Sequence, residues 1–316
     1  MRILVAGATG AIGSRLVPKL VRAGHAVTGL TRSAGKADLV KSMGAEPAIA
    51  DALDPQAVHD AVAAARPDVI VHELTDLKGE TDLRRFDRAF ANSNRLRTVG
   101  TDNLLVAARE NGVKRIVAQS FCGWPYARIG GSVKSEEDAL DPNPPAEQRR
   151  TLDAIRHLEH AVTTAPGLVG VVLRYGGFYG PGTGIFDPSM IDQIRRRQMP
   201  VIGGGTAWWS FVHIDDAAEA TALAVEQGSG IYNIVDDDPA PVRTWLPALA
   251  AMLGAKPPFR LPGWIARLIA GDHLVAMMTE SRAGSNAKAK AELGWQPRYA
   301  SWRQGFAGLA GADAGI

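Results

Sequence analysis

Three glycines near the start of the chain constrain its fold more than any other feature of the sequence. Gly7, Gly10 and Gly13 stand at three-residue spacing. A short apolar run over residues 3–6 precedes them, and apolar residues recur with helical period over residues 16–21. This order predicts a strand, a tight turn and a helix. Because such glycines let backbone amides approach a pyrophosphate, and a helix N-terminus offers unpaired N–H donors, the motif predicts a dinucleotide site.

Strand and helix patterns continue to alternate along the chain. Apolar runs predict strands over residues 26–30, around residue 48, and over residues 68–72, 115–118, 170–174 and 231–235, with helices over 34–43, 90–111 and 151–162. Such alternation predicts the α/β class, with a Rossmann doubly wound parallel sheet that binds ligands at the carboxyl ends of its strands. We expect residues 1–174, joined again by 208–236, to form the dinucleotide-binding domain. Residues 175–207 and 237–316 would form a smaller C-terminal α/β domain for the substrate.

Composition narrows the class of partner. The 316 residues are 46% hydrophobic and 22% charged, and 35 Lys plus Arg against 33 Asp plus Glu give a net charge of +2. Without a dense basic block, we expect no nucleic acid and no membrane surface as partner, but a small-molecule substrate. The single cysteine, Cys122, and the absence of a leader sequence predict a cytoplasmic protein. The apolar stretch over 264–278 is interrupted by charged residues, so we expect a buried helix or a substrate lid there.

The end of the second predicted strand bears on cofactor choice. It reads Thr31, Arg32 and Ser33, where an NAD-binding protein usually has a carboxylate for the ribose 2′-hydroxyl. Arg32 offers a forked cation and its neighbours offer hydroxyls, so the electrostatics favour NADP(H). The alternative is a solvated loop arginine. After the third strand, Asp51 is placed to meet an adenine amino group, whereas Asp54 before a proline predicts a helix N-cap.

Five motifs together resemble a known family. They are GATGAIG over residues 7–13, GTDNLL over 100–105, a segment from Leu173-Arg174 to YGPG at 179–182, FVHIDDA over 211–217 and KAELGW over 290–295. The chain resembles the extended short-chain dehydrogenase/reductases, the family of NAD-dependent epimerases and dehydratases. This resemblance implies a nicotinamide cofactor and a homodimer paired through the helices that hold Arg97 and Thr151. The residues predicted to bind the cofactor are Gly7, Thr9, Gly10, Ala11, Ile12, Gly13, Thr31, Arg32, Ser33, Asp51, Ala52, Leu74, Thr75, Ser120 and Tyr175.

The catalytic positions of that family are changed here. Its members use a Ser or Thr after the fifth strand and a Tyr-x-x-x-Lys on the next helix, where the ammonium lowers the phenol pKa and grips the ribose. When the flanking residues are aligned with the family's motifs, Cys122 falls at the Ser/Thr position, Thr151 at the tyrosine position and Ile155 at the lysine position. The supporting asparagine on the earlier helix is replaced by Arg97. The usual proton relay is therefore expected to be absent.

Another side chain would have to supply a proton. Tyr126, close after the fifth strand, is the best candidate by position, and the alternative is that it only packs. Tyr175 is expected to offer main-chain contacts to the nicotinamide amide, and Tyr179 to be structural. Cys122 has no assured base beside it, so a packing residue is the better interpretation than a nucleophile. We predict no metal site, because no ligand motif accompanies the histidines of the chain.

These features favour one function and leave two alternatives open. The first hypothesis is an NADP(H)-dependent oxidoreductase of a small organic carbonyl or alcohol, with protonation by Tyr126 or water. The second is a catalytically silent NADP-binding sensor or interaction protein. The third is a redox-neutral epimerase, lyase or cyclase that retains its cofactor. If Trp264, Leu268, Met277 and Met278 line the cleft, an apolar or aromatic substrate fits better than a sugar nucleotide.

Overall fold

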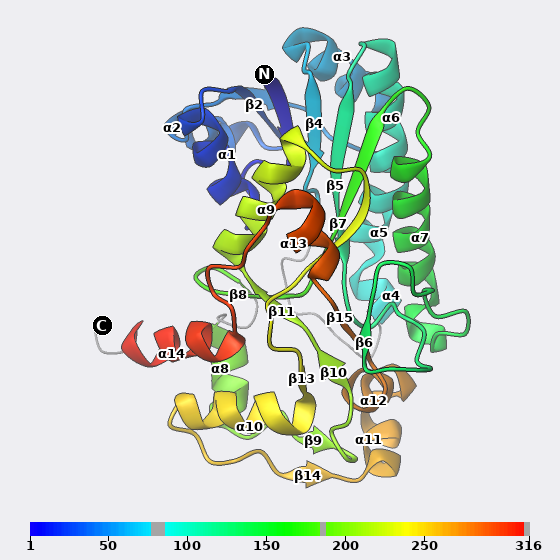
Figure 1. The fold of residues 1–316 in the computed structure, drawn as a ribbon, viewed down its shortest axis with the longest axis vertical. Helices are drawn as coiled ribbons and strands as arrows, with labels where there is room; N and C mark the ends of the chain where they lie inside the picture. Colours follow the sequence, from blue (N-terminus) through cyan, green and yellow to red (C-terminus); the bar gives the residue numbers. More distant parts are fainter. Residues whose placement is uncertain (77–85, 184–187, 313–316) are drawn as a thin grey trace.

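A seven-stranded parallel sheet forms the centre of the structure, a computed structural model that describes residues 1–76, 86–183 and 188–312 (Figure 1). In sheet order the strands are β12 (Gly230–Ile234), β7 (Val169–Tyr175), β5 (Arg115–Phe121), β4 (Val69–His72), β1 (Arg2–Ala6), β2 (Ala26–Thr31) and β3 (Glu46–Ile49). The chain runs from β1 outward to β3 and then crosses back to β4. The predicted α/β class with a Rossmann doubly wound sheet is confirmed.

Helices cover both faces of this sheet (Figure 1). One face carries α1 (Gly13–Arg22), α2 (Ala37–Ser42), α9 (Ile214–Glu226) and α13 (Ala287–Leu293). The other carries α3 (Pro55–Ala65), α6 (Thr101–Glu110) and α7 (Arg149–Thr163). Side chains alternate along each strand, so Ile3 and Val5 of β1 enter the first core while Leu4 enters the second. Because both faces are buried, the strands read as continuous apolar runs.

The long helix predicted over residues 90–111 is divided in the structure. It consists of α5 (Ala91–Arg95), a π-helical segment η3 (Leu96–Gly100) and α6, preceded by the short α4 (Phe86–Ala89). A π-helical segment adds a residue to a turn and shifts the helix face, and such segments are frequent at functional sites. Apolar spacing cannot reveal this shift. Arg97 lies in this segment and is buried.

A smaller lobe lies below the carboxyl edge of the sheet in Figure 1. Its core joins residues of α8 (Pro188–Arg195), α10 (Val242–Met252), α12 (Asp272–Thr279) and α14 (Trp302–Ala312). Short strand pairs complete it and connect it to the sheet: β8 (Gly177–Tyr179) with β11 (Phe211–His213), β9 (Val201–Ile202) with β14 (Arg260–Leu261), β10 (Trp208–Trp209) with β13 (Ala240–Pro241), and β6 (Val133–Lys134) with β15 (Ala283–Gly284). The short helices η1 (Ala34–Lys36) and η4 (Ala146–Gln148) precede α2 and α7. The proposed domain boundaries stay a prediction.

The apolar stretch over 264–278 differs from its prediction as a buried helix. It forms α11 (Gly263–Ala270) followed by α12. Met278 of α12 is buried in the smaller lobe, whereas Trp264 is 67% exposed and Leu268 is 79% exposed. Gly271, with a φ of +87°, separates the two helices. Within the described ranges, no helix is long and apolar enough to span a membrane.

Candidate functional site

The residues predicted to bind the cofactor gather at the carboxyl edge of the sheet. They follow β1, β2, β3 and β4 or lie at the ends of β5 and β7, and these ends share one edge because all six strands are parallel. The strand order reverses direction between β1 and β4, and ligands of open α/β sheets bind at such switch points. The fold thus places these segments around one candidate cofactor site.

The turn after β1 requires glycine at its first and last positions. Gly7 has a φ of +94°, and a Cβ there would lie 2.6 Å from the carbonyl oxygen of Glu73. A Cβ at Gly13 would lie 2.2 Å from the carbonyl oxygen of Gly7. Between them Gly10 and Ala11 are exposed, and no side chain caps the N-terminus of α1. The open amides of this turn fit the pyrophosphate of a dinucleotide.

Two cations lie near this turn, Arg32 directly after β2 and Lys36 in η1. The Arg32 side chain is 62% exposed, with Nη2 lying 3.4 Å from the Asp76 carboxylate. Lys36 Nζ donates a 3.3 Å hydrogen bond to Thr9 Oγ1. Sequence reasoning missed Lys36, although its four-residue spacing from Arg32 was a usable signal. It also missed Asp76, which partly compensates the Arg32 charge.

The turn after β3 separates the roles of its two aspartates. Asp54 accepts hydrogen bonds from the backbone N–H groups of Gln56 and Ala57, so the predicted N-cap of α3 is confirmed. Asp51 is exposed, and its Oδ1 accepts a 3.0 Å bond from the Leu53 N–H. The contact of Asp51 with adenine stays a prediction.

Thr151 and Ile155, which are predicted to stand where the family has its tyrosine and lysine, carry no group that exchanges protons at neutral pH. Thr151 is 1% exposed; its hydroxyl donates to Asp87 Oδ1 at 2.7 Å and accepts from Asn94 Nδ2 at 3.0 Å. Asp87 also accepts from the Thr151 N–H at 2.8 Å and so caps the start of α7. Ile155 is 1% exposed, one helical turn further on. Neither residue can repeat the chemistry of a phenol beside an ammonium.

Tyr126 is part of a buried polar network beneath the site. Its side chain is fully buried, its hydroxyl donates to Asn233 Oδ1 at 2.6 Å, and it accepts from Arg174 Nη1 at 3.0 Å. Arg174 forms a two-bond ion pair with Glu159 at 2.7 and 2.6 Å. The Ser120 hydroxyl donates to the same carboxylate at 2.7 Å. Because burial raises the pKa of the Tyr126 phenol, this geometry favours a structural role over the predicted role as proton donor.

Cys122 is also enclosed. The thiol is 2% exposed, and burial raises its pKa to about 12. A Cβ at Gly284, in β15, would lie 2.3 Å from the Cys122 Sγ, which shows how closely the sulfur packs against this backbone. A thiol in this state is a poor nucleophile. Its position agrees with the interpretation as a packing residue.

Tyr175 and Glu73 form a second buried pair, at the ends of β7 and β4. The Tyr175 hydroxyl lies 3.1 Å from Glu73 Oε1 and 2.7 Å from Thr221 Oγ1. The Tyr175 ring therefore points into the core, and contact with a cofactor would come from its main chain. Burial raises the pKa of Glu73 to about 8. Sequence reasoning missed Glu73, because a carboxylate at the end of an apolar strand gives no sign of its burial.

We expect Glu73→Gln to change how stability depends on pH. Between about pH 4.5 and 8 the folded protein keeps a proton on Glu73 that the unfolded chain has lost. Stability from this group is thus full below about pH 4.5 and falls as pH rises, by up to roughly 1.4 kcal/mol per pH unit. In urea unfolding at several pH values, the free energy of unfolding of the variant should rise relative to that of the parent between pH 5 and 8. Parallel curves for the two proteins would contradict this expectation.

An aromatic cluster lies beside the Thr151 end of α7. Phe86 stacks on Phe90 with ring centroids 4.4 Å apart and meets Trp124 edge-on at 5.4 Å, while Phe121 lies 6.3 Å from Trp124. Phe86 is adjacent in sequence to Asp87, which binds Thr151. Sequence reasoning missed this cluster, because its members come from segments far apart in the chain. Phe86 is 3% exposed, whereas the other three rings are partly exposed.

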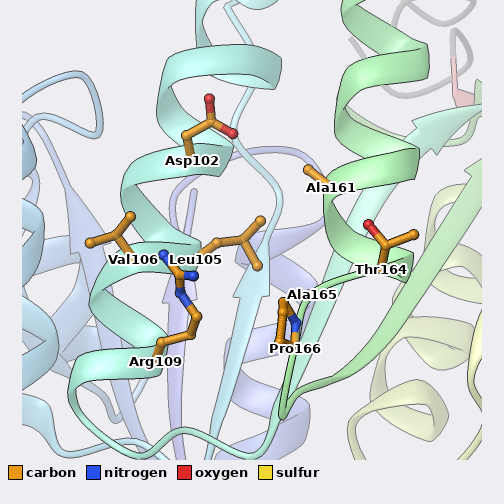
Figure 2. Close-up of a pocket in the computed structure, with 8 residues that line it drawn as sticks. All are labelled: Asp102, Leu105, Val106, Arg109, Ala161, Thr164, Ala165 and Pro166. Atoms are coloured by element: carbon orange, nitrogen blue, oxygen red, sulfur yellow. The ribbon is translucent and has the colours of Figure 1, made fainter.

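A groove of about 270 Å³ lies elsewhere, on the solvent side of α6 and α7 (Figure 2). Figure 2 shows Leu105 and Arg109 of α6 facing Ala161 and Pro166 across it. Both helices run from the carboxyl edge of the sheet toward the amino ends of β5 and β7, where this groove lies. It is therefore separate from the candidate cofactor site. The predicted homodimer, which would use these helices, stays a prediction.

Comparison with known proteins agrees with this geometry. The sequence model of the NAD dependent epimerase/dehydratase family matches residues 3–235. A Streptomyces sp. protein named 3-diazoavenalumate denitrifying reductase is 43% identical over 315 residues, which are 97% of this chain and 99% of the relative. A Stigmatella aurantiaca protein named 4-hydroxy-2-methyl-3-oxo-4-farnesyl-3,4-dihydroquinoline-1-oxide ketoreductase is 28% identical over 263 residues, which are 81% of this chain and 74% of the relative. The crystal structure of a Thermus thermophilus UDP-glucose 4-epimerase in complex with NAD matches with a TM-score of 0.75 and 26% identity, over 100% of both chains. The chain belongs to the NAD dependent epimerase/dehydratase family.

Proposed function

We propose that the chain is an NADP(H)-dependent oxidoreductase whose substrate accepts hydride without needing a proton from a side chain. The observation that carries this proposal is the identity and environment of residues 151 and 155 of α7. Thr151, with its hydroxyl held by Asp87 and Asn94, and Ile155 replace the phenol and the ammonium. A site that keeps the glycine turn but lacks this pair is suited to an electrophile that needs hydride alone.

An aryl diazo compound meets that requirement. Bound NADPH would supply a hydride, and Ar–N₂⁺ plus hydride gives Ar–H plus N₂: the C–N bond breaks, a C–H bond forms, and no proton is consumed. The 43% identical relative is named as a denitrifying reductase of a 3-diazo carboxylate, which supports this substrate class for the present chain. Phe90, Phe121 and Trp124, the partly exposed members of the aromatic cluster, would pack against the aryl ring.

Reduction of a carbonyl is the second candidate. The ketoreductase relative favours it, and the proton would then come from water because Tyr126 is fully buried. Carbonyl reduction consumes one proton for each hydride, whereas loss of N₂ from an aryl diazonium consumes none. The two reactions therefore differ in how turnover responds to pH and to deuterated water.

Purified protein with NADPH should separate these functions. We expect an aryl diazonium carboxylic acid to be consumed with one N₂ released per NADPH oxidised, at a rate that is flat across neutral pH. Tyr126→Phe, at equal folded concentration, should turn over at the parent rate. Turnover of ketones alone, slowing as pH rises, would favour the carbonyl candidate. NADPH binding without turnover of either class would favour the sensor, and isomerisation or elimination without net oxidation would favour the redox-neutral alternative.

The preference for NADP(H) can be tested at Arg32. We expect Arg32→Ala to raise the Kd for NADPH about tenfold, because a forked charge-assisted contact to the 2′-phosphate is lost. The Kd for NADH should stay within about twofold, since NADH lacks that phosphate. Titration calorimetry of both cofactors with both proteins provides the measurement. Equal losses for NADPH and NADH would show that Arg32 does not read the phosphate.

The remaining proposals concern the environment of the protein. We propose that two copies pair through the helical segments that hold Arg97 and Thr151, which are η3 and α7, and that the protein is cytoplasmic. Sedimentation at several protein concentrations tests the first, and cell fractionation tests the second.

A further inference from the structure

Arg97 is a buried cation with no ion-pair partner among the residues that the structure describes. Its residue is 8% exposed, and the guanidinium donates one side-chain hydrogen bond, from Nη1 to Asn94 Oδ1 at 3.0 Å. Among the described residues no carboxylate lies within ion-pair distance of it, and burial lowers its pKa to about 10. Burying an unpaired charge is costly, and natural proteins rarely keep one without a use for it. The other donors of this guanidinium are available to a bound molecule.

The surroundings of Arg97 show which molecule it can reach. Asn94, its hydrogen-bond partner, also donates to Thr151 Oγ1, at the former tyrosine position. The Arg97 charge also acts on His72, which ends β4 at the carboxyl edge of the sheet. The segment η3 packs against α7, the helix that carries Thr151 and Ile155, so Arg97 lies near both the end of β4 and α7. This is the region where the family lysine would grip the ribose.

We propose that Arg97 binds the ribose on the nicotinamide side of the cofactor, in place of the lysine that is missing at position 155. The positive charge is kept, but it comes from η3 instead of α7. Ribose hydroxyls can accept from a guanidinium in charge-assisted hydrogen bonds. The inference requires that a nicotinamide dinucleotide binds, and it is independent of which substrate is reduced.

The exchange of lysine for arginine has a chemical consequence. A guanidinium stays protonated throughout the physiological range and does not take part in proton transfer. With threonine at the tyrosine position, the site can hold the ribose firmly and yet pass no proton to the substrate. Arg97 thus binds the ribose as the lysine of the family's Tyr-Lys pair does, but nothing replaces the tyrosine as proton donor.

The first experiment measures binding to two ligands. In Arg97→Met we expect the Kd for NADPH to rise about tenfold or more. The Kd for 2′,5′-ADP, which lacks the second ribose, should change less than about twofold. Without cofactor, the variant should unfold at the same or a higher urea concentration than the parent, because an unpaired buried charge is gone. A structural role would give the reverse: lower stability and unchanged affinity for NADPH.

The second experiment moves the charge back. Arg97→Asn should lose affinity for NADPH as Arg97→Met does, and the double variant Arg97→Asn with Ile155→Lys should recover most of it. Arg97→Lys keeps a positive charge at the original position and should bind NADPH with intermediate affinity. This variant allows the test to be made even if Arg97→Met folds poorly. Equal weakening of NADPH and 2′,5′-ADP would overturn the proposal. So would unchanged NADPH affinity with a raised KM for substrate, since Arg97 would then bind the substrate.

Discussion

Arg174→Met should lower the free energy of unfolding by about 3–5 kcal/mol, the usual cost of removing one partner from a buried ion pair. Arg174 is 3% exposed and makes two hydrogen bonds to Glu159 and one to the Tyr126 hydroxyl. Without it, the Glu159 carboxylate stays buried with the Ser120 hydroxyl as its remaining side-chain donor. Urea unfolding followed by circular dichroism gives the measurement.

A matched double variant distinguishes the contribution of the Arg174–Glu159 ion pair to stability from that of the packing around it. Replacing both charges, with Arg174→Met and Glu159→Leu, leaves no buried ion without a partner, so most of the lost stability should return. Tyr126→Phe removes one neutral hydroxyl from the same network and should cost only about 1–2 kcal/mol. If Arg174→Met were no worse than Tyr126→Phe, the ion pair would not be the centre of this network.

Gly13→Ala should weaken NADPH binding by about a hundredfold or more, the equivalent of roughly 3 kcal/mol. The added Cβ would lie 2.2 Å from the Gly7 carbonyl oxygen and 2.7 Å from the Ala8 carbonyl carbon, and both are backbone atoms. The turn would have to open, which would move the amides that fit the pyrophosphate. Calorimetric titration with NADPH measures the loss.

A second glycine provides the control for this experiment. At Gly131, far along the chain from the turn, an added Cβ would find its nearest neighbour at 3.8 Å, an ordinary contact. Gly131→Ala should therefore keep the parent affinity and stability. A Gly13→Ala protein that stays folded and binds NADPH as tightly as the parent would show that the turn does not position the cofactor.

Local sequence signals predicted much of the fold and part of the site. Apolar period and glycine spacing act over a few residues, and they located the central strands and the turn from Gly7 to Gly13. Motif registration placed Thr151 and Ile155 one helical turn apart, and the structure has them on one buried face of α7. These predictions needed no knowledge of distant contacts.

Features that depend on long-range packing could not be read in the same way. The burial of Tyr126 depends on Asn233 of β12, and the cluster around Phe86 and Trp124 joins α4 to the segment after β5. Arg97 is buried within the π-helical segment η3, and a helical period alone cannot show one added residue. Exposure of Trp264 likewise depends on how α11 packs on the smaller lobe.

The late position of β12 in the chain has a consequence for synthesis on the ribosome. β12 forms one edge of the sheet and pairs with β7, but it is translated only after residues 176–229, which include part of the smaller lobe. Until then β7 has an unpaired edge, and the Tyr126 hydroxyl lacks its Asn233 acceptor. A nascent chain that has reached only β7 thus exposes a strand able to pair with other chains. We expect chains truncated just after β7 to aggregate, and chains extended through β12 to gain solubility.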